Sequence, residues 1–223
     1  MSDGMLENRR PLKSRSTAWA RALAAGLARM GVSPDLVSFG SIFFAVCGAA
    51  LFIASPTVVP LDERSVVLIA AAVCIQLRLL CNLLDGMVAV EHGRGSSSGP
   101  IWNELPDRIA DGLFLVGAGY FAAHKGVEMG EVLGWLAASL AVLTAYIREL
   151  GRGLGFPADF SGPMAKPHRM AALTLACVVS AIEPMWGWRG QTMLIALAVI
   201  VLGTVWTVVR RTLTLARRLK ERA

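Results

Sequence analysis

Apolar segments long enough to cross a membrane recur through almost the whole chain of 223 residues. A helix needs roughly 20 apolar residues to span the hydrocarbon core of a bilayer, which is about 30 Å thick. The hydrophobic content of 55% and the mean hydropathy of +0.56 are also higher than a soluble domain of this size would show. We therefore predict an all-α integral membrane protein with six transmembrane helices, at residues 35–55, 66–90, 106–124, 132–152, 169–187 and 190–210.

The parts of the chain outside these segments are short and polar. We predict a disordered tail over residues 1–15, a single six-helix membrane domain over residues 16–215 and a basic tail over residues 216–223. Because the six segments account for nearly the whole chain, we expect no separate soluble domain.

The segment that precedes the first span has the pattern of an amphipathic helix. Its larger apolar side chains recur at helical spacing and its arginines fall on other faces, so we expect it to lie at the cytoplasmic membrane interface. Ser33 and Pro34 then predict the start of the first span, because serine is a good N-cap and proline suits the first helical position. The apolar stripe of the preceding helix consists of Trp19, Leu23, Leu27 and Met30.

Lysine and arginine gather at the two ends of the chain, which has a formal net charge of +6. By the positive-inside rule, this predicts a multi-pass protein of the cytoplasmic (inner) membrane with both termini in the cytoplasm. The basic ends are expected to contact anionic membrane lipids. No nucleic-acid partner is expected, because the basic residues flank membrane spans and form no domain of their own.

Polar side chains interrupt the apolar pattern where the second span ends and the third begins. Asn82 and Asp85 share one face of the second span, and Asn103, Asp107 and Asp111 recur every four residues in the third. The short connection makes these two helices antiparallel neighbours, so the two oxygen-rich stripes can face each other just inside the membrane. Carboxylates at this depth usually mark function, and their chemistry suits a hard divalent cation such as Mg²⁺ or Mn²⁺.

This stretch resembles the signature of the CDP-alcohol phosphatidyltransferase family, D-x2-D-G-x2-A-R-x8-G-x3-D-x3-D, with every spacing kept. The layout of spans, the preceding amphipathic helix and the stretch SPDLVS extend the resemblance over most of the chain. The positions that match are Asp85, Gly86, Ala89, Gly99 and Asp107. The positions that depart are Asn82, Val90 and Asn103, where the family has Asp, Arg and Asp.

The resemblance implies an enzyme of phospholipid biosynthesis. It would transfer a phosphatidyl or other phosphoalcohol group from a CDP-linked donor, with CDP-diacylglycerol favoured, to an alcohol acceptor and release CMP. It also implies one or two Mg²⁺ or Mn²⁺ ions and a homodimer. The implied metal ligands are Asn82, Asp85, Asn103 and Asp107, and the implied nucleotide contacts are Gly86, Ala89 and Gly99.

Two alignments of the last motif position give two candidates for the general base. In the ungapped register Asp107 is the base. If the connection contains a four-residue insertion, Asp107 and Asp111 take the last two positions, and Asp111 becomes the base or an extra metal ligand. The two asparagines also remove two negative charges from the implied metal site, so the number of ions stays open.

The acceptor is expected near the end of the fourth span and in the connection that follows it. Arginine-rich pockets favour acceptors that bear phosphate, although the positive-inside rule alone would also place basic residues there. The candidate acceptor-binding residues are Arg148, Arg152, Lys166, His168 and Arg169.

Two other functions remain open from the sequence. The two asparagines are compatible with a catalytically impaired relative that binds a CDP-lipid without turnover. A small membrane carrier would explain carboxylates in a membrane, but it would not explain the spacing of Gly86, Ala89 and Gly99.

Overall fold

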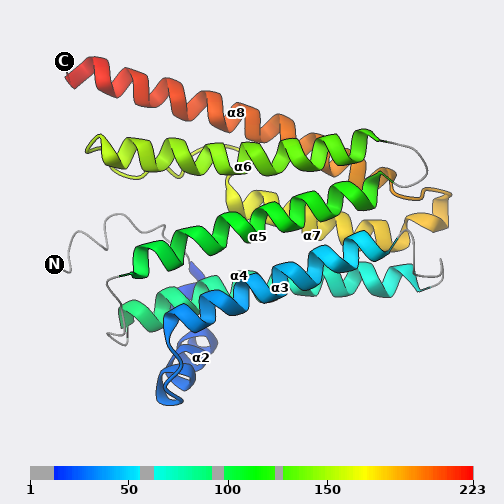
Figure 1. Cartoon of the computed structure of the whole chain (residues 1–223), viewed down its shortest axis with the longest axis horizontal. Helices are drawn as coiled ribbons and strands as arrows, with labels where there is room; N and C mark the ends of the chain where they lie inside the picture. Colours follow the sequence, from blue (N-terminus) through cyan, green and yellow to red (C-terminus); the bar gives the residue numbers. More distant parts are fainter. Residues whose placement is uncertain (1–12, 56–62, 92–97, 124–127, 223) are drawn as a thin grey trace.

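The computed structural model describes residues 13–55, 63–91, 98–123 and 128–222, and in this part of the chain it is helical with no β-strand. Over these residues, two short 3-10 helices accompany seven α-helices, and Figure 1 shows their arrangement. The 3-10 helices are η1 (Lys13–Ser16) and η2 (Glu183–Trp186). The α-helices are α2 (Ala18–Arg29), α3 (Pro34–Ala54), α4 (Arg64–Glu91), α5 (Gly99–Ala122), α6 (Met129–Gly153), α7 (Lys166–Ile182) and α8 (Gln191–Arg222).

The long helices run roughly parallel to one axis and alternate in direction along the chain (Figure 1). α5 packs against α3 and α6, α6 packs against α8, and α7 lies between α4 and α8. The starts of α3, α5 and α7 therefore meet the ends of α4, α6 and α8 at one end of the bundle. α2 packs on α4 at this same end, which we call the α2 end.

In the described part of the chain, five helical segments are long and apolar enough to cross a membrane: α3, α4, α6, α7 with η2, and α8. The predicted all-α membrane architecture is thus confirmed. The predicted count of six spans is not, because α5 does not meet the same criterion. Its 24 residues include Glu104, Asp107, Arg108 and Asp111. The predicted span 106–124 already contained three of these charges.

Close backbone contact fixes α5 against α6. A Cβ atom added to Gly119 would lie 2.8 Å from the Cα of Gly134, and one added to Gly134 would lie 2.8 Å from the carbonyl oxygen of Leu115. Small residues let helix backbones approach in this way in membrane proteins. On other faces of α5, Phe114 and Phe121 are fully buried in the main core.

The α2 helix forms where the sequence predicts it, but it packs through a different face. Ala20, Ala24 and Ala28 are buried, and their cluster includes Leu83 and Met87 of α4. Small side chains allow this close packing, and of the predicted stripe only Leu27 packs against this cluster. Trp19, Leu23 and Met30 are exposed and remain available to a membrane interface.

The helix boundaries differ from the predictions mainly at the chain ends. Ser33 caps α3 as predicted, accepting a hydrogen bond from the backbone N–H of Leu36 at 3.2 Å. The predicted disordered segment 1–15 overlaps η1, and the predicted tail 216–223 continues α8 as far as Arg222. The Arg222 guanidinium donates to the carbonyl of Leu154 at 2.7 Å, which holds this last turn against the end of α6.

Candidate active site

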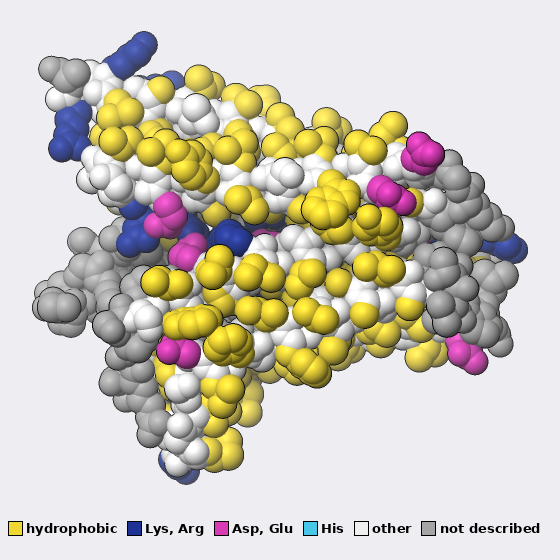
Figure 2. All heavy atoms as spheres, viewed as in Figure 1, with side chains coloured by type: hydrophobic (Ala, Val, Ile, Leu, Met, Phe, Trp, Pro, Cys, Tyr) yellow, Lys and Arg dark blue, Asp and Glu magenta, His cyan; other side chains and the backbone are white. Residues whose placement is uncertain are grey.

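A cavity of about 500 Å³ opens at the α2 end of the bundle. Its wall is built by η1, α2, α4, α5, α6, α7, α8 and the connection between α6 and α7. The space-filling view shows a hollow there, with Lys, Arg, Asp and Glu side chains inside an otherwise hydrophobic surface (Figure 2). The charged residues predicted on separate helices therefore share one compartment.

The α4 wall carries Asn82 and Gly86 at the cavity surface, with Asp85 just behind them. Asp85 is buried, and its Oδ2 accepts a hydrogen bond from the hydroxyl of Ser38 on α3 at 2.8 Å. Its Oδ1 accepts from the backbone N–H of Gly86 at 2.5 Å. Two hydrogen bonds therefore fix the orientation of this carboxylate.

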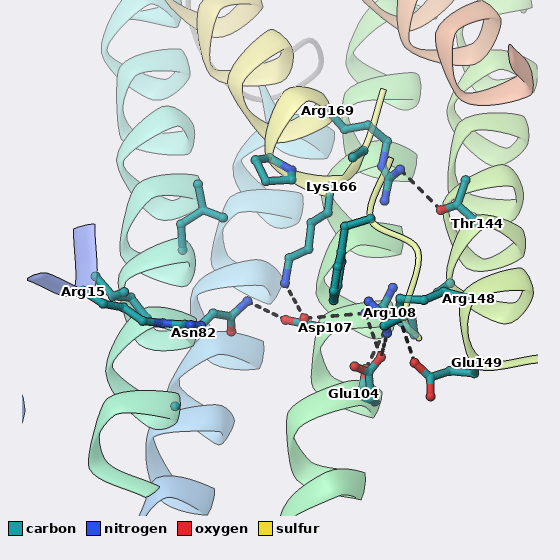
Figure 3. A pocket seen from close by; sticks show the side chains of 18 of the residues that line it. Arg15, Asn82, Glu104, Asp107, Arg108, Thr144, Arg148, Glu149, Lys166 and Arg169 are labelled. Carbon is teal, nitrogen blue, oxygen red and sulfur yellow. Dashed lines mark hydrogen bonds and ion pairs between the residues drawn. The ribbon is translucent and has the colours of Figure 1, made fainter. Parts of the chain in front are cut away.

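Asp107 on α5 contacts side chains from two other helices, α4 and α7 (Figure 3). Its Oδ1 accepts hydrogen bonds from the Asn82 amide and, at 3.2 Å, from the Arg78 guanidinium, both on α4. Its Oδ2 pairs with the ammonium of Lys166 on α7 and lies 3.6 Å from the Arg108 guanidinium. The contact between Asn82 and Asp107 confirms that the two predicted polar stripes face each other.

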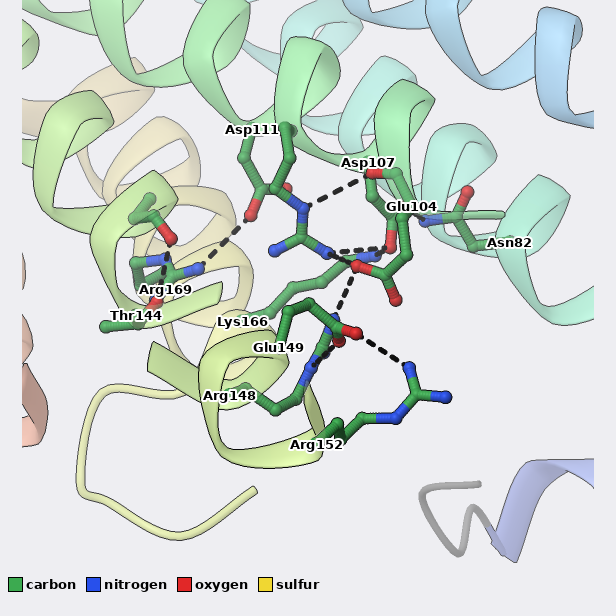
Figure 4. A network of polar contacts seen from close by, with 12 residues as sticks. Asn82, Glu104, Asp107, Asp111, Thr144, Arg148, Glu149, Arg152, Lys166 and Arg169 are labelled. Atoms are coloured by element: carbon green, nitrogen blue, oxygen red, sulfur yellow. Dashed lines mark hydrogen bonds and ion pairs between the residues drawn. The ribbon is translucent and has the colours of Figure 1, made fainter. Parts of the chain in front are cut away.

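Asp111 lies one helical turn deeper than Asp107 and is also ion-paired (Figure 4). It is 2% exposed. Its Oδ1 accepts from Arg78 at 2.6 Å, and its Oδ2 accepts from Arg169 at 3.2 Å. Arg78 is fully buried. It pairs with both Asp107 and Asp111 and so bridges them beneath the cavity floor.

The wall formed by α5 and α6 alternates acidic and basic side chains (Figure 4). Arg148 donates to Glu104 at 2.5 Å and to Glu149 at 2.8 Å. Arg152 also pairs with Glu149, at 2.7 Å, and Arg108 pairs with Glu104 at 3.1 Å. These pairs hold the arginines at the cavity surface without a ligand.

Arg211 of α8 lines the cavity and was missed at the sequence level. It is buried and donates to the carbonyls of Ser161 and Thr144, both at 2.9 Å. From the sequence, Arg211 was only one of the basic residues that the positive-inside rule explains at the end of the last span. Thr204, Thr207 and Arg211 are all buried and recur at helical spacing, and this polar stripe was the available signal.

The connection between α6 and α7 enters the bundle and closes the side of the cavity. The Met164 backbone N–H donates to the Thr207 hydroxyl at 3.1 Å. In the same connection the pKa of Asp159 is lowered, since hydrogen bonds from Ser161 and the charge of Arg211 outweigh burial, which acts to raise it. This packing places Lys166, at the start of α7, beside Asp107.

The structure brings most of the predicted site residues together. Among the described residues, the cavity lining includes Asn82, Gly86, Asp107, Arg148, Arg152, Lys166 and Arg169, with Asp85 directly behind. Besides Asp85, four further predicted residues do not line it. Asp111 lies below the floor, Ala89 and Gly99 lie beyond the lining, and His168 is exposed. The side chain of Asn103 lies outside the described residues.

The donor chemistry of this site suits a divalent metal ion. Asp85 and Asp107 supply carboxylate oxygens and Asn82 supplies an amide oxygen, and such oxygens are the ligands that Mg²⁺ and Mn²⁺ prefer. No group of three or more His, Cys, Asp or Glu side chains that could hold a metal occurs in the described part of the chain. The donor set of two carboxylates and one amide fits a divalent ion.

The chain is similar in sequence to known lipid synthases, although no family model matches it. It is 30% identical over 203 residues to the archaetidylinositol phosphate synthase of Aeropyrum pernix, covering 91% of this chain and 92% of that one. It is 29% identical over 210 residues to the phosphatidylinositol phosphate synthase of Mycobacterium tuberculosis, covering 88% and 91%. The relationship therefore extends over nearly the full length of each protein.

Solved structures agree on the fold. The M. tuberculosis phosphatidylinositol phosphate synthase with CDP-diacylglycerol bound matches with a TM-score of 0.73 at 24% identity, over 88% of this chain and 92% of that one. The same synthase in complex with manganese and citrate also gives 0.73, over 88% of each chain.

The chain belongs to the CDP-alcohol phosphatidyltransferase family. It is a membrane enzyme of phospholipid biosynthesis that transfers a phosphatidyl group from a CDP-linked lipid to an alcohol, in a family that uses divalent metal ions.

Proposed function

We propose that the cavity at the α2 end binds CDP-diacylglycerol beside a phosphorylated alcohol and joins them. The observation that carries this proposal is the position of Asp107 on the cavity wall, between the α4 residues of the motif and the arginines of α6. In the reaction, the acceptor hydroxyl oxygen forms a bond to the β-phosphorus of the donor. The bond from that phosphorus to the bridging oxygen breaks, CMP leaves, and the hydroxyl proton passes to Asp107.

The donor would lie along the end of α4. Gly86 is at the cavity surface and has no side chain to obstruct a nucleotide. Asp85, Asp107 and the amide oxygens of Asn82 and Asn103 would hold the metal ion. When bound, that ion supplies positive charge that neutralises the diphosphate of the donor.

The acceptor would lie against the arginines of the cavity. Arg148 and Arg152 reach it from α6, Lys166 and Arg169 from α7, and Arg211 from α8. Fork-shaped guanidinium groups bind phosphate in a bidentate manner. Because the relatives are inositol phosphate lipid synthases, we propose inositol phosphate as the first acceptor to examine. The exposed position of His168 gives it no part in this pocket.

For the membrane arrangement, we propose α5 as the sixth span and the cytoplasm as the compartment that the α2 end faces. α5 is enclosed by α3 and α6, which lets its charged residues face the bundle interior. The basic residues in the last turn of α8 lie at the α2 end, in agreement with the positive-inside rule. The homodimer implied by the family stays a prediction, which cross-linking in native membranes would test.

The test is CMP release by the purified full chain. It would receive CDP-diacylglycerol, Mn²⁺ and either inositol phosphate, inositol, glycerol phosphate or glycerol. We expect release with a phosphorylated acceptor, and a loss of about 10²–10⁴-fold in Asp107→Asn, the usual contribution of a general base. Glu131→Gln, an exposed carboxylate change at the opposite end of α6, is the matched control. Donor binding without release for any acceptor would instead indicate the catalytically impaired relative.

A further inference from the structure

The layer around Asp107 contains as many fixed cations as carboxylates. Asp107 and Asp111 are paired with three basic side chains from α4 and α7, and Asp85 interacts electrostatically with both Asp107 and Lys166. Arg108 lies 3.6 Å from Asp107 but is balanced by its closer partner Glu104, at 3.1 Å. The negative members are Asp85, Asp107 and Asp111, and the positive members are Arg78, Lys166 and Arg169. This layer is therefore neutral before any metal ion binds.

These ion pairs leave few carboxylate oxygens to which a second divalent ion could bind. Lys166 and Arg78 already use oxygens of Asp107, and Arg78 and Arg169 use both oxygens of Asp111. The asparagine in the first motif position, Asn82, offers only a neutral carbonyl oxygen. A second ion would thus add two positive charges beside Lys166 and Arg78 with no carboxylate left to balance them.

The charge of a first divalent ion is balanced only when the donor is bound. Uncompensated charge inside a membrane protein is unfavourable. One divalent ion in the neutral layer leaves an excess of two positive charges, and the diphosphate of a CDP-linked lipid brings two negative charges to the same place. The ion and the donor should therefore bind together, each increasing the affinity of the other by the same factor.

We propose that this enzyme uses one divalent ion, which enters with the donor diphosphate, and that Lys166 and Arg78 supply fixed positive charge in place of a second ion. The proposal rests on the proposed function, since it assumes that a CDP-linked lipid occupies the cavity. The proposal also accounts for the two asparagines of the motif. A site with two fewer carboxylates needs less positive charge from metal ions, because Lys166 and Arg78 already supply it.

The proposal is tested by counting Mn²⁺ ions on the full chain in lipid nanodiscs, using electron paramagnetic resonance with and without CDP-diacylglycerol. We expect one ion per chain with the donor and no spectrum of an exchange-coupled pair. We also expect the affinity for Mn²⁺ to rise by about 5- to 150-fold when the donor is added, the usual range for coupled sites. Two ions per chain, or equal affinity with and without the donor, would overturn the proposal.

Variants then identify the fixed cation. In Lys166→Met, removal of a charge beside Asp107 should tighten Mn²⁺ binding without the donor by at least about tenfold. Lys220→Met, which changes an exposed lysine in the last turn of α8, should leave it unchanged. An unchanged or weaker affinity in Lys166→Met would contradict the proposal.

Asn82→Asp provides an independent measurement, which also serves if Lys166→Met does not fold. It adds a carboxylate without removing a cation, so donor-free Mn²⁺ binding should again tighten by at least about tenfold, and no tightening would refute the proposal. These counts need no turnover. Failure of CMP release with every acceptor would reject the proposed function, whereas CMP release with two bound ions would reject only this inference.

Discussion

The two ends of the bundle both bury acidic side chains, but they use them differently. At the end opposite α2, Glu183 is 1% exposed and its carboxylate accepts hydrogen bonds from the backbone N–H groups of Gly190 and Thr192. Arg64 lies nearby, with its guanidinium 4.5 Å from the ring centroid of Phe121. The Glu183 carboxylate therefore closes the turn between η2 and α8.

At the α2 end, by contrast, Asp107 and Asp111 pair mainly with side chains from other helices, and a cavity lies beside them. A carboxylate that binds the backbone of its own turn stabilises local structure. A carboxylate shared between helices and open to a cavity can also act on a ligand. The difference in partners, more than burial itself, distinguishes a structural acidic residue from a functional one.

The largest effect that separates the two ends should come from Asp107→Asn. We expect CMP release to fall by about 10²–10⁴-fold. The thermal midpoint of the purified protein should fall less than in Asp111→Asn, because the Asp107 and Lys166 side chains are partly exposed and Arg78 keeps Asp111 as a partner. Activity and thermal midpoint should be measured on the same preparation. A large loss of stability would place Asp107 with the structural group.

Asp111→Asn should produce the opposite result at the same end. It leaves Arg78 and Arg169 without their shared carboxylate, and breaking a buried ion pair in this way costs about 3–5 kcal/mol of folding free energy. The protein that remains folded should keep measurable CMP release. If Asp111→Asn instead abolished turnover without loss of stability, the shifted register with Asp111 as base would be supported.

Glu183→Gln should lower stability by a smaller amount and leave the chemistry intact. Hydrogen bonds to a charged group contribute about 1.5–3 kcal/mol, and the amide replaces one of the two acceptor oxygens with a donor. We expect a lower thermal midpoint with an unchanged activity per folded molecule. Altered donor affinity would mean that the two ends are coupled.

Ser38→Ala should have the smallest effect. The hydroxyl of Ser38 orients Asp85 from outside the cavity, and loss of such an outer partner typically weakens metal binding by about 10–100-fold. Stability should fall by about 1 kcal/mol. A Mn²⁺ titration of CMP release would show the activity recovering at higher Mn²⁺. Activity that does not recover would point to a direct role for Ser38.

Reasoning within single helices predicted much of this molecule. The polar stripes of α4 and α5 were read from spacing, and the contact between Asn82 and Asp107 confirms that they meet. The Ser33 cap of α3 was predicted for the same reason, since the capping residue and its partner are only three positions apart.

Contacts between distant helices could not be read in this way. Arg78 of α4 falls at no position of the motif, yet it pairs with Asp107 and Asp111 on α5. Lys166 was assigned to an acceptor-binding connection, whereas the inward path of that connection makes it the first residue of α7 and a partner of Asp107. Which residues meet across helices depends on helix depth and rotation, and these follow from packing over the whole bundle.

The glycine contact between α5 and α6 also limits how the enzyme can change shape. With the backbones at Gly119 and Gly134 in close contact, we expect the two helices to move as one body. The separation of Asp107 and Arg148 should then change little during a catalytic cycle. If Asp107 is the base and the arginines of α6 bind the acceptor, as we propose, the acceptor must match a length that two distant glycines help to set.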